Sequence, residues 1–308
     1  MKILNKKTIT STIWVLLLSC VAYGDSGETS GIILNKPVTA NQAGLGNAVA
    51  GEDGILAMRI NPAGLSGMDS PEISLMYNRG YFEDNFISAT FAADAGFAGI
   101  GANVVYSATE KIGIWSSDNE YIEEIGQRDI ILSLSASSEK LIRTLPLGIN
   151  FTMLNSSIFG NSATAFSMGV GARYSLTLAG NKLNIGTGIQ NIGTALKYID
   201  HEAPLPAFFQ AGASYSLYPG DRKLALNTDL RIPLNSDDIY LMGGLSYRAI
   251  PEITLLSGGE INLNKDVSGA KLNLGAEITA GSYKFSYVID IVQDIDPSHY
   301  ISLGLLLE

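Results

Sequence analysis

Charge, cysteine, histidine and long apolar runs are all scarce in this chain of 308 residues. Charged residues make up 16% of it, whereas hydrophobic residues make up 46% and mean hydropathy is +0.19; an average soluble domain has roughly 25% charged residues. One Cys and two His exclude a disulfide scaffold and argue against a metal cluster. Beyond the N-terminus no uncharged apolar run approaches the roughly 20 residues of a membrane-spanning helix, which excludes a polytopic helical membrane protein. Two classes remain, a Gly-rich soluble all-β domain and a β-barrel whose outer face contacts lipid.

Residues 1–24 have the features of a secretory signal peptide. Three lysines precede an apolar stretch, residues 9–18, that is too short to span a bilayer. Small residues at the −3 and −1 positions predict cleavage before Asp25. A second outcome stays open, because the Leu-Leu-Ser-Cys sequence that ends at Cys20 resembles a lipobox and would leave a lipidated Cys20 at the new N-terminus.

Neither nucleic-acid binding nor catalysis is predicted. Cleavage would remove three lysines and no acid, so the net charge would fall from −10 to about −13, and a strongly acidic chain is a poor ligand for nucleic acid. No G-x-S-x-G sequence is present. His201 and His299 have no neighbours at the spacing of a metal site or a nucleophile–base pair. We therefore expect no enzyme activity, no cofactor and no metal.

From residue 72 onward, stretches of about ten residues alternate large apolar with small or polar side chains, the period of a β-strand with two unlike faces. In the stretch 164–176, for example, Phe166 and Met168 fall on one face and Ser167 and Arg173 on the other. The stretches are 72–82, 85–93, 96–108, 127–138, 146–157, 164–176, 182–193, 205–217, 223–233, 238–249, 252–262, 270–280, 283–293 and 299–308.

The strand number and the connections favour a membrane barrel. Fourteen is even, as single-chain bacterial barrels require, and a lipid-facing sheet must close because no edge amide can stay unpaired. Short connections such as 250–251 and 281–282 alternate with longer ones such as 109–126 and 194–204. A soluble sandwich or propeller remains the alternative, because alternation does not reveal which face is outside. We predict an all-β, fourteen-stranded antiparallel transmembrane β-barrel over residues 72–308.

Residues 25–71 lack the strand pattern and carry a series of short motifs. Ala-Gly-Leu-Gly-Asn-Ala begins at Ala43, an acidic pair with Gly follows at residues 52–54, and Asn-Pro-Ala-Gly-Leu begins at Asn61. Further along are Gln-Asn-Ile-Gly at 190–193 and Leu-Pro at 205–206. Together these motifs resemble the FadL-like outer-membrane protein superfamily, and their order and spacing are most similar to its PorV/PorQ (UPF0164) branch.

The resemblance covers the mature chain and implies an N-terminal hatch, residues 25–71, folded inside the barrel lumen. By match to the hatch motif, Asn61, Pro62 and Ala63 would form its functional turn, and Pro62 would restrain Asn61 to an extended conformation. An ordinary stop before the first strand would use the same residues. In the fatty-acid transporters a kink in the third strand opens a lateral path; Gly99 and Gly101 mark either such a kink here or a close approach of the hatch.

Nine charged residues are expected to face the lumen, because an Arg or Lys facing lipid at the midplane costs about 2–4 kcal/mol. They are Arg173, Asp229, Arg231, Arg248, Glu260, Lys271, Glu277, Lys284 and Asp290. They would contact a substrate or the hatch, or pair with one another. The first functional hypothesis is passage of small hydrophobic, fatty-acid-like molecules across the bacterial outer membrane with the hatch as gate. The second is a PorV-like barrel that docks secreted proteins or secretion machinery.

Overall fold

The computed structural model describes residues 29–81, 84–109, 112–115, 121–139, 145–218, 223–265 and 269–307. The predicted signal peptide, with the candidate lipidation site Cys20, lies outside the described residues. Within them, no helix has the length and apolar character needed to cross a membrane.

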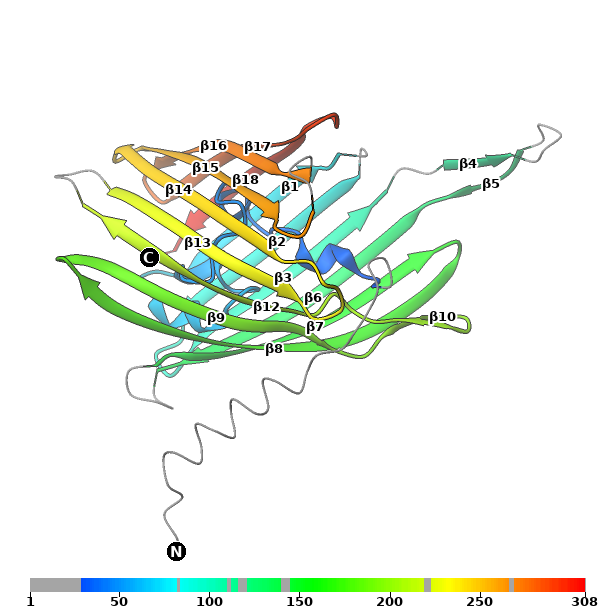
Figure 1. Ribbon diagram of the computed structural model, residues 1–308, viewed down its shortest axis with the longest axis horizontal. Helices are drawn as coiled ribbons and strands as arrows, with labels where there is room; N and C mark the ends of the chain where they lie inside the picture. Colours follow the sequence, from blue (N-terminus) through cyan, green and yellow to red (C-terminus); the bar gives the residue numbers. More distant parts are fainter. Residues whose placement is uncertain are drawn as a thin grey trace, which may run out of the picture.

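Fourteen strands in the described part of the chain form one closed antiparallel barrel (Figure 1). They are β1 (Glu72–Arg79), β2 (Asn85–Asp94), β3 (Gly99–Ala108), β6 (Gln127–Ser138), β7 (Leu147–Ile158), β8 (Asn161–Leu178), β9 (Asn181–Gly193), β12 (Phe208–Leu217), β13 (Lys223–Pro233), β14 (Tyr240–Ile250), β15 (Ile253–Asn262), β16 (Lys271–Ala280), β17 (Tyr283–Val292) and β18 (Ser298–Leu306). Each lies on one of the predicted stretches, so the predicted fourteen-stranded antiparallel barrel is confirmed.

Closure is made by the first and last strands. β1 pairs with β18 from Glu72 opposite Leu306 to Arg79 opposite His299. Every other barrel strand pairs with the barrel strands that precede and follow it in the sequence. Two short hairpins lie in the sequence between barrel strands and form separate two-stranded sheets. We call the end where β1 begins and β18 ends the terminal end, and the opposite end the distal end.

The two hairpins lie in the long distal connections. β4 (Ile112–Trp115) pairs with β5 (Tyr121–Ile125), and β10 (Leu196–Tyr198) pairs with β11 (His201–Ala203). In Figure 1 the β4–β5 hairpin projects well beyond the other strands. Both long connections predicted from the sequence therefore fall at the same end, and each contains a hairpin that the alternation did not predict.

The apolar face of each strand points outward. On β6, the apolar Leu132 and Leu134 are exposed, whereas the polar Asp129, Ser133 and Ser135 are buried. Exposed apolar side chains likewise alternate with buried polar ones on other strands of the barrel. Soluble proteins rarely expose apolar patches larger than a few hundred Å², whereas a barrel in a bilayer needs an apolar band on its outside. The structure thus settles the orientation that periodicity left open, in favour of a lipid-facing barrel.

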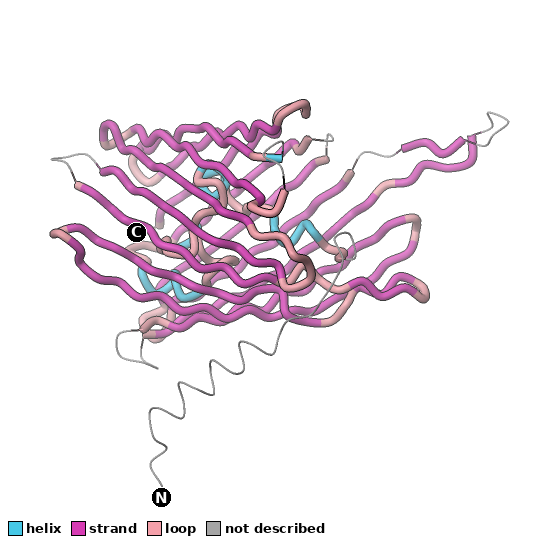
Figure 2. Tube along the Cα trace, in the orientation of Figure 1, coloured by secondary structure: helices cyan, strands magenta, loops and turns pink. Residues whose placement is uncertain are grey.

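Residues 29–71, which we call the luminal segment, lie inside the barrel (Figure 2). The segment contains short helices, η1 (Ile32–Asn35), α2 (Ala40–Gly44), η2 (Gly54–Leu56) and η3 (Pro62–Gly67). Its apolar side chains Ile33, Leu34 and Ile60 pack on inward residues of the wall such as Phe86 and Leu154. Because a fourteen-stranded barrel is too wide for wall side chains to fill, this segment provides the core.

Candidate functional site inside the barrel

The turn at Asn61 is hydrogen-bonded both within the luminal segment and to the wall. Asn61 is fully buried and extended, and it caps η3, which begins at Pro62. Its Nδ2 donates to the carbonyl oxygens of Ala50, at 2.8 Å, and Ala172, at 3.1 Å, while its Oδ1 accepts from the Ala63 amide at 3.2 Å. One side chain therefore joins two parts of the segment to strand β8, and Asn-Pro-Ala is the corner where the segment turns.

Glycines in the wall let the backbone of the segment approach this closely. A Cβ atom at Gly148 of β7 would lie 2.3 Å from the Ala63 nitrogen, and one at Gly186 of β9 would lie 1.7 Å from the Ala50 oxygen. Real Cβ atoms do not make such contacts. Any larger residue at either position would displace the luminal segment.

Amide side chains of β9, β12 and β13 hold the segment through its backbone. Gln190 donates to the Ile60 oxygen at 3.0 Å, Gln210 to the Asn47 oxygen at 3.1 Å and Asn227 to the Ala48 oxygen at 2.9 Å. The Ala50 amide donates to Asp229 at 2.8 Å. Buried polar groups need such partners, and here the wall supplies the partners of an irregular backbone.

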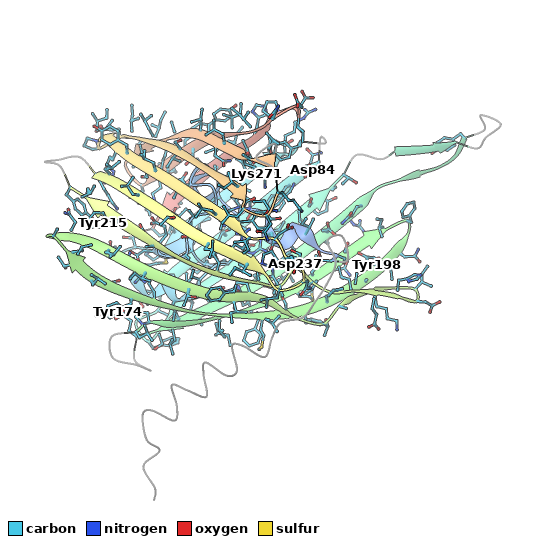
Figure 3. All side chains as sticks on the ribbon, viewed as in Figure 1. Asp84, Tyr174, Tyr198, Tyr215, Asp237 and Lys271 are labelled. Atoms are coloured by element: carbon cyan, nitrogen blue, oxygen red, sulfur yellow. The ribbon has the colours of Figure 1, made fainter. Side chains whose placement is uncertain are left out.

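Two charged residues of the segment, Asp53 and Lys36, form ion pairs near opposite ends of the barrel. Asp53 pairs with the buried Arg173 of β8 and, at 2.8 Å, with Lys182 of β9. Lys36 pairs with Asp84, in the distal connection between β1 and β2, and its Nζ lies 5.6 Å from the ring centre of Phe86. Asp84 is labelled in Figure 3.

The other predicted luminal charges also lie on the inner wall. Arg231 donates from Nε to Gln210 at 2.9 Å, and Glu277 accepts from Asn41 of the segment at 2.5 Å. Lys271 pairs with Glu260 at 3.3 Å and Lys284 with Glu72 at 3.2 Å. Arg248 and Asp290 line the two cavities described below.

Gly99 and Gly101 of β3 face the luminal segment. Added Cβ atoms would lie 2.4 Å from the Leu65 oxygen and 2.4 Å from the Met58 sulfur, respectively. β3 pairs residue for residue with β2 and β6 from Gly99 to Ala108, without a register shift. The glycines therefore accommodate the segment, and the wall is continuous beside them.

One buried cation of the segment was not singled out from the sequence. Arg59 donates from Nη2 to the Leu34 oxygen at 2.7 Å, and burial lowers the pKa of its guanidinium to about 10. Its position after an apolar run carried no signal of burial. The alternation also did not single out Gln190, Gln210 and Asn227 as contacts of the segment. Each occupies an inward position of its strand, and that position could have identified them.

Two cavities lie on opposite sides of the luminal segment and share no lining residue. The distal cavity, about 1410 Å³, is lined by residues that include Ile32, Ala43, Phe208, Arg231 and Tyr300. Lys271, which is labelled in Figure 3, is one of its lining residues. The terminal cavity, about 390 Å³, is lined by residues that include Asn41, Leu45, Arg248, Glu277 and Lys284.

Arg231 provides an unsatisfied donor at the distal cavity. Its side chain is 6% exposed, its guanidinium carbon lies 4.7 Å from the ring centre of Phe208, and its Nη2 has no hydrogen-bond partner among the described residues. No group of three or more His, Cys, Asp or Glu side chains in the described part of the chain is arranged to hold a metal.

Comparison with known proteins gives a structural likeness only. No family model and no curated protein sequence matches the chain. The Ralstonia pickettii toluene transporter TbuX matches with a TM-score of 0.62 and 14% identity, over 88% of this chain and 98% of that one. The fold is FadL-like.

Two further solved structures agree with that assignment. The Pseudomonas putida toluene transporter TodX matches with a TM-score of 0.59 and 12% identity over 92% of this chain and 99% of that one. A Pseudomonas aeruginosa FadL homologue matches with a TM-score of 0.57 and 12% identity over 87% and 98% of the two chains. At these identities the likeness shows a shared fold and nothing more. It extends over nearly the full length of each neighbour.

Proposed function

We propose that this chain is an outer-membrane channel for small hydrophobic, fatty-acid-like molecules and that the luminal segment is its gate. The observation that carries the proposal is the division of a lipid-facing, FadL-like barrel into two cavities by one internal segment. The solved structures with the same fold include proteins named as toluene transporters. A gate must be held firmly enough to close the lumen and weakly enough to move.

The contacts of the segment fit such a gate. It is held by side-chain hydrogen bonds and by the ion pairs of Asp53 and Lys36, and it contributes no strand to the barrel. Displacing it would leave the fourteen-stranded ladder intact. The luminal segment can therefore open or close the lumen without destabilising the wall, as a channel requires.

Uptake by living cells tests the proposal. The full chain is expressed in a bacterium that has a lipopolysaccharide outer membrane and lacks its own fatty-acid transporter, and entry of a labelled long-chain fatty acid and of toluene is measured. We expect entry above that of cells without the chain, and no increased entry of a labelled sugar of similar size. Entry of the hydrophobic probes equal to that of empty cells, with the chain present and folded in the outer membrane, would refute the proposal.

A docking role for exported proteins is the second candidate, favoured by one observation at the distal rim. Phe159, in the turn between β7 and β8, and Ile199, in the turn between β10 and β11, are exposed and flank a cavity of about 460 Å³. Crosslinking in cells, with and without Phe159→Ser and Ile199→Ser, tests this role. A specific exported partner that is lost in the double variant would support docking; unchanged crosslinks would argue against it.

A further inference from the structure

One turn of the luminal segment has neighbouring residues that line different cavities. Leu45 lines the terminal cavity, whereas Ala43, Gly46 and Asn47 line the distal cavity. Residues 43–46, which we call the septum turn, therefore separate the two spaces.

The septum turn lies directly on the backbone of β14 and β15. A Cβ at Gly244 would lie 2.7 Å from the Leu45 oxygen, and one at Gly258 would lie 2.4 Å from the Gly46 nitrogen. Gly244 and Gly258 are opposite each other in the ladder. Neither carries a side chain, so withdrawal of the turn would leave open space along the wall.

The turn is hydrogen-bonded to the wall on either side. On one side Ala40 donates to Ser302 at 2.7 Å and Asn41 to Glu277 at 2.5 Å, and on the other Asn227 and Gln210 donate to the oxygens of Ala48 and Asn47. Between these anchors the turn packs with its backbone against Gly244 of β14 and Gly258 of β15.

The distal cavity, on one side of the turn, is lined in part by a buried cation. Arg231 is nine-tenths buried, lines the distal cavity together with Ala43 and Gly46, and keeps one nitrogen without a partner. That nitrogen has no accessible surface, so a solute in the distal cavity meets the rest of the lining, which includes Phe208 and Ala43. The septum turn bounds this cavity on the side of the luminal segment.

We propose that solute passes axially between the septum turn and strands β14 and β15, the turn bowing away from Gly244 and Gly258 while the rest of the luminal segment stays in place. This route rests on the proposed transport function and specifies its path. It differs from a lateral exit through the third strand, where Met58 and Leu65 pack against Gly101 and Gly99 and the ladder is continuous.

Two engineered disulfides distinguish the routes. Leu45→Cys with Gly244→Cys joins the septum turn to β14, where the Leu45 Cβ lies 3.0 Å from an added Cβ. Met58→Cys with Gly101→Cys joins the segment to β3 instead, where the Met58 Cγ lies 3.1 Å from an added Cβ. Uptake of the labelled fatty acid is measured in cells before and after reduction, and formation of each disulfide is checked by mass spectrometry.

We expect the septum disulfide to lower uptake at least tenfold, with recovery on reduction, and the β3 disulfide to change it less than twofold. Full uptake with the septum disulfide formed would overturn the route, and so would a block by both disulfides, since the segment would then move as one body. Absence of uptake by the unmodified chain would instead count against the proposed function.

A second measurement does not depend on uptake or on disulfide formation. Gly244 faces the septum turn, whereas a Cβ at the adjacent Gly243 would meet nothing within 4 Å. Gly244→Ala should raise hydrogen exchange at residues 43–46 at least tenfold and leave the amides of residues 58–64 unchanged, whereas Gly243→Ala should change neither. Equal effects of the two variants, or exchange that spreads to residues 58–64, would overturn the independent movement of the turn.

Discussion

Replacing Asp53 by asparagine should release the luminal segment from the wall without unfolding the barrel. Asp53 is the counter-ion of Arg173, whose side chain is 4% exposed, and also contacts Lys182, whose side chain is 47% exposed. Removing one partner of a fully buried ion pair costs about 3–5 kcal/mol, because the other charge stays buried and unpaired. Since the Asp53 side chain is 28% exposed, we take about 2 kcal/mol as the loss, which is on the order of a 30-fold shift toward the released segment.

Hydrogen exchange in detergent measures that shift. The amides of Ala50 and Glu52, which donate to Asp229 and to the Val49 oxygen, should exchange on the order of 30-fold faster in Asp53→Asn. The strand amides should keep their protection, because no ladder bond is altered. Lys182→Met is the matched control: it removes the exposed partner, so exchange should rise less than about fivefold, as expected for a surface pair worth about 1 kcal/mol or less.

The reasoning would be refuted in two ways. Unchanged exchange at Ala50 and Glu52 in Asp53→Asn would show that the buried pair does not hold the segment. Equal effects of Asp53→Asn and Lys182→Met would show that burial of Arg173 contributes nothing to the pair.

Three further changes test the other contacts of the segment. Asn61→Ala removes the donor to the oxygens of Ala50 and Ala172, so the free energy of unfolding should fall by about 1–3 kcal/mol, whereas the partly exposed Asn155→Ala should cost under about 0.5 kcal/mol; equal losses would argue against the turn as an anchor. Gly186→Ala places a Cβ against the Ala50 oxygen, so limited proteolysis should cut residues 48–52 while the barrel keeps its heat-modifiable gel mobility; protection equal to that of the unmodified chain would contradict the contact. Lys36→Met breaks a part-exposed pair, so it should cost about 1 kcal/mol or less at low salt and less still at about 1 M salt; a salt-independent loss would point to packing on Phe86 instead.

Sequence periodicity predicted the barrel well because strand faces are a local property. β6 has the bounds expected from alternation, Gln127–Ser138. β8 runs from Asn161 to Leu178, longer than the predicted 164–176, because the positive φ angles of Phe159 and Gly160 make a two-residue turn and let the ladder continue to it. The β4–β5 hairpin escaped prediction because residues 112–125 carry no sustained apolar alternation.

The site was predicted less completely because its partners are distant in the sequence. Asn61 was singled out by its motif, but its partner on β8, Ala172, lies 111 residues away and follows only from the strand register. Gln190 sits beside a register shift between β8 and β9, next to Asn191 with φ of 61°, and such an irregularity has no simple sequence signature. Gly99 and Gly101 had two readings, and only the positions of Met58 and Leu65 show a close approach.

The most direct test of the account compares fatty-acid uptake by cells that carry the unmodified chain, Asp53→Asn or Lys182→Met at equal amounts in the outer membrane. If the luminal segment closes a transport lumen, uptake should exceed that of empty cells for the unmodified chain, rise further in Asp53→Asn and change little in Lys182→Met. Uptake that is the same in Asp53→Asn and the unmodified chain, although hydrogen exchange shows the segment released, would contradict the central claim.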